Sequence, residues 1–509
     1  MSIGFPISHG NPCQDIVVRA LLIAPSFPDT FWSFRHALRF VHKRASFPPL
    51  GLITMAAMLP KDWSLRLVDT NVRRLTDADL AWADSAWIGG MTIQQDSALE
   101  VLRRCKAAGL ITVVGGPMAT CEPECFDQAD HLVLNEAEVT LPRFLRDLEQ
   151  GQPERVYQDE QKPDLTQTPA PRWDLVDMKR YGSMCVQFSR GCPFDCDFCN
   201  VTALLGRFPR TKSSSRMIAE LDSLYSSGWR GPVFFVDDNL IGNKKAIREL
   251  LPRLAAWRRG KRPIRLQTEA SINLADDPKL QQAMVQAGFD TVFVGIETPD
   301  EEALAECRKR QNVSRDLVAD VRKLHRAGLQ VQGGFILGFD ADTPSIFQRQ
   351  IEFIQKSGIV TAMVGLLQAP VGTRLYEKLK LEGRLLGAFT GDNVDGSTNI
   401  LTRMPIDTLK DGYRRVMSYV YAPEHYYQRI KTFLRDYNPP RVRPRFRLSQ
   451  LAAFVRSAWG LGVLHRGRWQ YWKLLTWTLL RHPRHFSLAV RLWIYGHHFR
   501  QVCRLRLTR

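Results

Sequence analysis

Short apolar runs and amphipathic helical stretches alternate along the first third of the chain. Runs typical of buried strands occur at 17–25, 64–69, 85–90, 111–116 and 131–136. Apolar residues at helical spacing separate them, for example at 96–108 and 140–150. Such alternation is typical of a doubly wound parallel sheet with helices on both faces. The pattern therefore predicts a Rossmann-like α/β domain over residues 17–150.

A second series of strands and helices follows with a different spacing. Its candidate strands lie at 185–189, 233–237, 264–269, 291–297, 330–339 and 362–369. Helical patterns separate most of them, as at 215–227 and 314–327. Six such units predict a partial (β/α)6 barrel over residues 183–400, in which reactive groups sit at the carboxyl ends of the strands.

The remaining segments are predicted from composition. The polar stretch 151–182 contains Pro163, Pro169 and Pro171 and is expected to be a linker. Residues 1–16 are expected to be a flexible start. Beyond residue 401 the strand signals stop, which predicts a helical C-terminal extension over residues 401–509 that is rich in arginine and tryptophan.

The positive charge is concentrated in the last part of the chain. The net charge is +18, and the segment 437–509 holds fifteen Arg and Lys residues and no Asp or Glu. Its tryptophans can be core packing, or they can lie among the headgroups of an anionic membrane. Nucleic acid would be attracted by the same charge, but no recognised nucleic-acid motif is present, so none is expected as a partner.

Targeting signals are absent from the sequence as read. The opening residues lack the basic start and apolar run of a signal peptide, and nowhere do eighteen apolar residues follow one another. The ten cysteines are mostly scattered, which favours a reducing compartment over a disulfide framework. We expect a cytoplasmic protein, with peripheral contact to the inner face of the cytoplasmic membrane through residues 437–509 left open.

One tight cysteine cluster stands out in the stretch FSRGCPFDCDFCN, residues 188–200. It places Cys192, Cys196 and Cys199 directly after the first strand of the expected barrel. A helix would put all three on one buried face, but Gly191 and Pro193 interrupt any helix here. Zinc sites usually need four ligands, and no fourth Cys or His is nearby in sequence. Three thiolates instead leave one iron of a four-iron cubane open to a ligand from outside the protein.

The cluster resembles the CxxxCxxC loop of the radical S-adenosylmethionine (SAM) enzymes, which follows the first strand of a partial barrel. The resemblance implies a [4Fe-4S] cluster on the three cysteines, with SAM bound to the open iron through its amino and carboxylate groups. Transfer of one electron into the sulfonium then gives a 5′-deoxyadenosyl radical. A flavodoxin-type or ferredoxin-type electron donor is implied as a partner.

Further segments extend the resemblance to members that also carry an N-terminal cobalamin domain. They are VFFVDDNLIG (233–242), GIETP (295–299), GGFILGFDADT (333–343) and APVGTRLYEKLKLEGRL (369–385). The residues that this likeness places around SAM or the substrate are Asp237, Asp238, Asn239, Thr268, Glu269, Ser271, Glu297, Gly334, Ile336 and Gly338.

The first domain resembles the cobalamin domains of the same enzymes. The segments GGMTIQQ (89–95), GGPMAT (115–120) and LNEAEVTLP (134–142) look like those that hold the corrin at the carboxyl edge of the sheet. The residues implied are Met91, Thr92, Gly115, Gly116, Pro117, Asn135 and Glu136. The DxHxxG loop that supplies an axial histidine in other cobalamin domains is absent, and His36 and His42 have the wrong spacing. An ordinary Rossmann-like domain is the alternative.

Together these features predict a cobalamin-dependent radical SAM C-methyltransferase that acts on an unactivated carbon of a lipid-like or other small-molecule substrate. Within the family, QFSRGCPFDCDFC, FVDDNLIGNKKA and TEASINLADD resemble hopanoid C-2 methylases, whereas the loop 29–49 departs from them. Three alternatives stay open. They are a non-methylating rearrangement or redox enzyme with the same cofactors, a transfer-RNA methylthiotransferase, and a non-enzymatic carrier of cobalamin or lipid.

Overall fold

The computed structural model describes residues 17–392, 394–439, 448–465 and 467–507. Over these residues the chain divides into two compact units. Unit 1 contains residues 17–28, 47–181 and 219–229, and unit 2 contains 29–46, 182–218 and the described residues from 230 onward. The expected flexible start, residues 1–16, lies outside the described residues.

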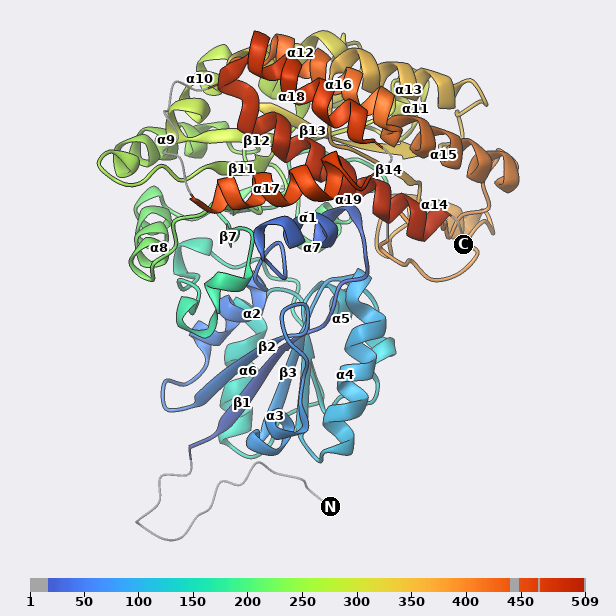
Figure 1. The fold of residues 1–509 in the computed structure, drawn as a ribbon. Coiled ribbons are helices and arrows are strands. Elements are labelled where there is room, and N and C mark those ends of the chain that lie inside the picture. Colours follow the sequence, from blue (N-terminus) through green and yellow to red (C-terminus); the bar gives the residue numbers. More distant parts are fainter. Residues whose placement is uncertain (1–16, 393, 440–447, 466, 508–509) are drawn as a thin grey trace. The chain divides into compact units, whose positions relative to one another are not determined.

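A six-stranded parallel sheet forms the centre of unit 1 (Figure 1). Its strand order is β2-β1-β3-β4-β5-β6. The strands are β1 (Arg19–Ala24), β2 (Ser64–Asp69), β3 (Ser85–Gly89), β4 (Ile111–Gly115), β5 (His131–Val133) and β6 (Val156–Tyr157). Because β2 and β3 lie on opposite sides of β1, the chain reverses direction across the sheet between β1 and β3. Ligands of such sheets bind beside that point, at the carboxyl ends of the strands.

Helices cover both faces of this sheet, as the alternation of strand and helix predicts. The helices of residues 47–181 are α2 (Leu50–Met55), α3 (Asp77–Trp82), α4 (Gln95–Ala107), α5 (Pro117–Cys121) and α6 (Ala137–Glu149). One face packs against Leu80, Leu102 and Met118, and the other against Leu141 and Phe144. The segment expected to be a linker adds the short edge strand β6, which pairs with β5 through Leu132 and Val156.

A second six-stranded parallel sheet forms unit 2, in the order β14-β13-β12-β11-β10-β7. Its strands are β7 (Met184–Val186), β10 (Val233–Phe235), β11 (Leu266–Glu269), β12 (Phe289–Glu297), β13 (Gln330–Leu337) and β14 (Ala362–Leu366). Each of the six lies inside or overlaps one of the six runs read from the sequence. A two-stranded antiparallel pair, β8 (Ser189–Arg190) and β9 (Arg210–Thr211), is added beside the cysteine loop.

Helices connect these strands as in a (β/α) barrel. They are α7 (Val201–Leu205), α8 (Ser214–Ser226), α9 (Lys244–Arg258), α10 (Pro278–Ala287), α11 (Glu301–Glu306), α12 (Leu317–Ala327), α13 (Ile346–Ser357) and α14 (Arg374–Leu381). Local signals fix their ends. In α10, Asp277 caps the backbone N–H of Leu280, and Gly288 ends the helix with φ = 105°. The predicted partial (β/α)6 barrel is confirmed.

Five helices complete unit 2 after the last strand. They are α15 (Ile406–Tyr421), α16 (Pro423–Asp436), α17 (Leu448–Gly462), α18 (Arg468–Arg481) and α19 (Phe486–Leu507). Figure 1 draws them from orange to red beside the barrel strands. The segment 29–46, with the short helix α1 (Arg35–Leu38), belongs to the same unit, where Phe34 lies against Tyr495 and His498 of α19. The predicted helical extension is confirmed as helical.

One of the tail tryptophans, which were expected either in a core or at a membrane, belongs to the core of unit 2. Trp493 of α19 is fully buried, and Val490 is buried beside it on the same helix. The tryptophans of α17 and α18 behave differently, because Trp459, Trp469 and Trp472 are exposed. Among the described residues, none of the helices combines the length and the apolar character that crossing a membrane requires.

Candidate active site at the carboxyl edge of the barrel

The three cysteines lie in the loop that follows β7, between β8 and α7. The backbone N–H of Cys192 donates to the carbonyl oxygen of Gly206 at 3.2 Å, and that of Cys199 donates to the carbonyl oxygen of Cys196 at 3.2 Å. Gly191 begins this loop with φ = 94°, and a Cβ there would lie 2.8 Å from the oxygen of Gly206. Only glycine fits both the conformation and the close approach.

Asp237 fixes the start of the cysteine loop. Its carboxylate accepts hydrogen bonds from the backbone N–H and the hydroxyl of Ser189 and, at 3.1 Å, from the backbone N–H of Phe188. Burial raises the pKa of Asp237 to about 7, against the effect of these hydrogen bonds. With no exposed surface, this side chain positions the loop. The structure favours that role over the predicted contact with SAM, which stays a prediction.

Polar groups from three other segments surround the thiols. The side-chain amide of Asn239 lies 3.9 Å from Sγ of Cys192 and 3.1 Å from the hydroxyl of Ser271. The side-chain amide of Gln311 lies 3.7 Å from Sγ of Cys196. Asn239 and Ser271, both predicted, therefore join the cysteine loop to the end of β11, whereas Gln311 was not predicted.

Lys309 places a buried positive charge close to all three thiols. Burial raises the pKa of each cysteine thiol, that of Cys199 to about 12, and the charge of Lys309 acts in the opposite direction on all three. For Lys309 itself, burial alone would lower the pKa, but the charge of Glu297 and nearby thiolates raise it above its usual value. A positive charge beside thiolates stabilises them electrostatically.

The thiol set fits an iron–sulfur cubane better than a single metal ion. In the described part of the chain, no three Cys, His, Asp or Glu side chains come close enough to hold one ion. The thiolates of a cubane bind three different irons and therefore stand further apart than the ligands of one ion. Three thiols with amide donors aimed at two of the sulfurs match such a cluster.

A fourth thiol, Cys307, lies near the cysteine loop without belonging to it. The backbone N–H of Asp197 donates to the carbonyl oxygen of Cys307 at 3.1 Å. However, the Cys307 side chain is buried in an apolar cluster with Phe339 and Leu379. Its thiol lies 3.6 Å from the carbonyl oxygen of Leu304, and burial raises its pKa to about 12. The structure therefore gives Cys307 a packing role.

Carboxyl groups line the ends of β10 and β11 beside the cysteine loop. Burial raises the pKa of Asp238 to about 6, and one of its carboxylate oxygens is buried without a hydrogen-bond partner. Burial, followed by the charges of Asp238 and Asp237, raises the pKa of Glu269 to about 8. Such a concentration of acids suits a cationic ligand, and the sulfonium and ammonium groups of SAM are cations.

The end of β12 carries a distorted residue that was also predicted. The pairing of β12 with β13 shifts register between Gly295 and Glu297, and Glu297 has φ = 65°. Its carboxylate accepts a hydrogen bond from Nζ of Lys309 at 2.6 Å. A Cβ on Gly295 would lie 2.2 Å from that carboxylate. Gly295 therefore makes room for the Glu297–Lys309 pair next to the thiols.

The inner face of the barrel can be identified from the register of partly exposed strand residues. Phe293 of β12 lies in register with Glu269 on one side and Gln332 on the other. Gln267, two residues before Glu269, is also partly exposed, whereas Thr268 between them is buried on the opposite face. Of the predicted residues, Thr268 is thus the one whose side chain this alternation does not place on the inner face of the barrel. Period-two alternation of polar residues in an apolar strand could have identified Gln267 and Gln332.

The predicted glycines of β13 have packing reasons of their own. A Cβ on Gly334 would lie 2.9 Å from the ring of Phe293, and Gly338 has φ = 104°. The backbone N–H of Gly338 donates to the carboxylate of Asp342 at 2.8 Å, which closes the turn after the strand. Ile336 lies between the two glycines, partly exposed on the inner face. Their predicted position near SAM or the substrate stays a prediction.

The seven residues predicted to hold cobalamin all lie at the end of β3, β4 or β5 or directly after it, at the carboxyl edge of the sheet in unit 1. They are Met91, Thr92, Gly115, Gly116, Pro117, Asn135 and Glu136. A Cβ on Gly115 would lie 2.6 Å from the carbonyl oxygen of Val133, and Gly116 has φ = 83°. Pro117 begins α5. The two glycines therefore allow neighbouring backbone segments of this edge to approach each other closely.

Polar and apolar groups at this edge are compatible with cobalamin. Met91 is 52 % exposed, unusually high for a methionine, whereas Thr92 is buried. Asn135 has φ = 61°, and its side-chain oxygen is buried without a hydrogen-bond partner, so it is free to accept a bond from a ligand amide. Glu136 is buried, and its carboxylate lies 3.9 Å from Nζ of Lys162.

His36, whose spacing in the sequence is wrong for an axial ligand, belongs to unit 2. There it lies 3.5 Å from the carboxylate of Asp29.

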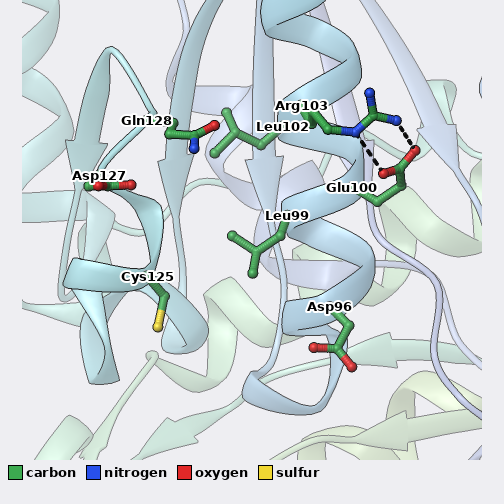
Figure 2. A pocket seen from close by; sticks show the side chains of 8 residues that line it. All are labelled: Asp96, Leu99, Glu100, Leu102, Arg103, Cys125, Asp127 and Gln128. Atoms are coloured by element: carbon green, nitrogen blue, oxygen red, sulfur yellow. Dashed lines mark hydrogen bonds and ion pairs between the residues drawn. The ribbon is translucent and has the colours of Figure 1, made fainter.

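A separate hollow of about 450 Å³ lies in unit 1 between α4 and residues 125–128. Figure 2 shows Leu99 and Leu102 of α4 on one side of it and Cys125 on the other, with Arg103 and Glu100 bonded to each other. None of the seven residues predicted to hold cobalamin lines it. We therefore do not connect this hollow with the candidate sites.

Similarity to known proteins agrees with this geometry. Residues 186–354 match the radical SAM superfamily, and residues 373–508 match a domain of unknown function (DUF4070). The chain is 41% identical to an uncharacterized methyltransferase of Synechocystis sp., over 95% of this chain and 92% of that protein. It is 33% identical to the hopanoid C-2 methylase of Rhodopseudomonas palustris, over 91% of this chain and 90% of that protein.

The chain belongs to the radical SAM superfamily. Within that superfamily it belongs to the same family as these two relatives, which confirms the predicted resemblance and the prediction of a radical SAM enzyme. A solved structure of the cobalamin-dependent SAM radical enzyme OxsB aligns with a TM-score of 0.62 at 14% identity, over 96% of this chain and 84% of that one. This likeness confirms the fold class predicted from the sequence.

Proposed function

We propose that this radical SAM enzyme is a cobalamin-dependent C-methyltransferase that methylates an unactivated carbon of a lipid-like substrate. The observation that carries the proposal is a three-thiol loop at the carboxyl edge of a (β/α)6 barrel, in a chain that also holds a doubly wound parallel sheet. The substrate class is proposed from the relative named as a hopanoid C-2 methylase. A different small molecule remains within the proposal.

Cys192, Cys196 and Cys199 hold a [4Fe-4S] cluster, whose bound form supplies single electrons to SAM. The chain's own residues orient the reactants. Asp237 keeps the cysteine loop in place, Asn239 and Gln311 donate toward the sulfurs, and the Glu297–Lys309 pair sets the charge beside them. The carboxyl groups of Asp238 and Glu269 attract the cationic groups of SAM.

Cobalamin is the proposed carrier of the methyl group, held at the carboxyl edge of unit 1. The glycines of that edge allow the corrin to approach the backbone, and the side-chain oxygen of Asn135 accepts from one of its amides. The DxHxxG loop that supplies a histidine in other cobalamin domains is absent from the sequence. The protein's contribution is to bind and shield the cofactor.

The proposal also covers the electron donor and the location of the protein in the cell. A flavodoxin-type or ferredoxin-type protein supplies electrons, as the cluster requires. The protein is cytoplasmic, and its C-terminal helices bring it to the membrane where a lipid-like substrate resides. The acid-free sequence of residues 437–509 supports this last step.

The test is product analysis with the anaerobically reconstituted enzyme, reductant, hydroxocobalamin and a bacterial lipid extract that contains unmethylated hopanoids. In the proposed reaction one substrate C–H is replaced by C–CH3. One SAM gives methionine and 5′-deoxyadenosine, and a second gives S-adenosylhomocysteine. We expect a product heavier by one CH2 and equal amounts of the two nucleosides. Formation of 5′-deoxyadenosine without S-adenosylhomocysteine would instead support the non-methylating alternative.

A further inference from the structure

Exposed apolar side chains are concentrated in the C-terminal helices. Of the twenty large apolar side chains that are exposed in the described part of the chain, ten lie between Leu451 and Leu505. Seven of them lie on α17, in the turn after it or at the start of α18. Here these seven are called the apolar patch: Leu451, Val455, Trp459, Val463, Leu464, Trp469 and Trp472. Trp459, Leu464 and Trp469 are 65–70% exposed.

Helix α17 is apolar on two opposite faces. Ala453, Ser457 and Leu461 recur every four residues and are buried against the rest of unit 2. Leu451, Val455 and Trp459 recur at the same spacing on the other side and face solvent. A surface helix normally presents polar residues on its outer face. The packing of this chain alone therefore does not explain why the outer face of α17 is apolar.

The turn between α17 and α18 is packed by one tryptophan of the patch. The indole N–H of Trp472 donates to the carbonyl oxygen of Gly462 at 2.9 Å, and a Cβ on Gly462 would lie 3.0 Å from that ring. Gly462 thus lets Trp472 pack on the end of α17. The backbone N–H of Leu464 donates to the carbonyl oxygen of Trp459 at 3.3 Å, which closes the end of the helix.

The exposed charges on α18 and directly after it are all positive. Arg468, Lys473, Arg481 and Arg484 are exposed on or directly after α18. No ion pair to a carboxylate is present for any of the four among the described residues. The sequence from 437 to 509 contains no acid that could provide one. Exposed tryptophan and leucine beside unpaired cations suit the headgroup layer of an anionic membrane.

We propose that the apolar patch and its surrounding cations dock the enzyme peripherally on an anionic lipid surface. A second copy of the chain suits the patch less well, because a twofold contact would bring the same cations together. Nucleic acid suits it less well too, because aliphatic side chains such as Leu451 and Val455 gain little against phosphates. Such docking would give the enzyme access to a lipid-like substrate. This purpose of the apolar patch rests on the proposed function.

The test measures vesicle binding by the full reconstituted chain without substrate, so that it does not depend on methyl transfer. Vesicles of phosphatidylcholine alone are compared with vesicles that contain one third phosphatidylglycerol. We expect binding to the anionic vesicles that weakens as salt rises from 0.1 to 0.5 M, by screening of surface charge. The Trp459→Ser/Trp469→Ser variant should bind about tenfold more weakly.

Two further variants give the test its specificity. Lys473→Gln/Arg481→Gln should lose affinity for anionic vesicles only. Leu381→Ser, which removes an 89% exposed side chain outside the patch, should bind like the native chain. The proposal is overturned if the tryptophan variant binds vesicles as the Leu381 variant does. It is equally overturned if light scattering shows that the tryptophan variant abolishes a dimer while vesicle binding is absent from the native chain.

Discussion

The two parallel sheets of this protein both have a carboxyl edge at which ligands can bind, but the residues at the two edges differ in kind. At the barrel edge, thiols, carboxyl groups and one buried ammonium lie at the strand ends or in the segments that follow them. At the edge of unit 1, the seven predicted positions include two glycines and a proline but only one ionisable residue, Glu136. The first edge suits small charged ligands, bound by side-chain chemistry. The second suits a large flat ligand, for which shape matters more than charge.

The largest expected effect tests the positioning role of Asp237. Asp237→Asn removes a carboxylate that accepts from Ser189 and Phe188 and leaves a buried donor opposed to their N–H groups. We expect a loss of about 3 kcal/mol in unfolding free energy and less than half of the native iron content. Asp342→Asn, at a similar buried carboxylate after β13, is the control. It should destabilise the chain without affecting iron. Equal iron loss in both variants would contradict the assignment.

The next prediction concerns the pH dependence of stability. The folded-state pKa of Glu269 is raised to about 8, so its contribution to stability is fully present below its unfolded pKa. It is lost as the pH rises through about 8. Because the side chain is partly exposed, we expect a loss on the order of 2 kcal/mol between pH 5 and 8.5. Glu269→Gln should flatten this slope in thermal unfolding measured across the range. If the variant loses stability with rising pH as steeply as the native chain does, Glu269 does not cause this pH dependence.

A third prediction tests whether shape governs the edge of unit 1. Gly115→Ala places a methyl group 2.6 Å from the oxygen of Val133, a backbone atom that cannot move aside easily. We expect cobalamin affinity to fall about tenfold, measured by visible absorbance titration of the corrin. Gly51→Ala in α2 is the matched control, because a Cβ there meets nothing within 4 Å. If both variants bind cobalamin alike, the corrin does not lie along this part of the edge.

The smallest predicted effect is electrostatic. Lys309→Met removes the positive charge beside the thiols and should make the midpoint potential of the cluster more negative by on the order of 40 mV. The double variant Lys309→Met/Glu297→Gln removes both charges of the pair and should show a smaller shift. Spectroscopic redox titration distinguishes the two. A positive shift in the single variant would contradict a role for this charge.

The sequence predicted the parts of the molecule that depend on local pattern. Strand positions followed from apolar runs, because a strand buried on both faces needs them, and the cysteine loop followed from spacing alone. What the sequence did not reveal depends on long-range contacts. Lys309 and Gln311 reach the cysteine loop only because the turn after α11 folds back onto it. Similarly, strand β6 is short and lies in a proline-rich stretch, so only its pairing with β5 identifies it.

Some predicted residues also have packing roles that the sequence did not reveal. The fully buried carboxylate of Asp237 holds the cysteine loop in place. The absence of a side chain at Gly334 leaves room for the ring of Phe293. In both cases the sequence position identifies an important residue. Which neighbour it serves depends on the direction of its side chain, which sequence alone does not give.

Iron and sulfide analysis of the anaerobically purified chain tests the central claim most directly. We predict about four irons and four sulfides per chain, as a cubane requires. Substituting Cys192, Cys196 and Cys199 together by alanine should abolish both the cluster and the cleavage of SAM, whereas Cys307→Ala should retain both. A native chain without iron, or a triple variant that still cleaves SAM, would contradict the account.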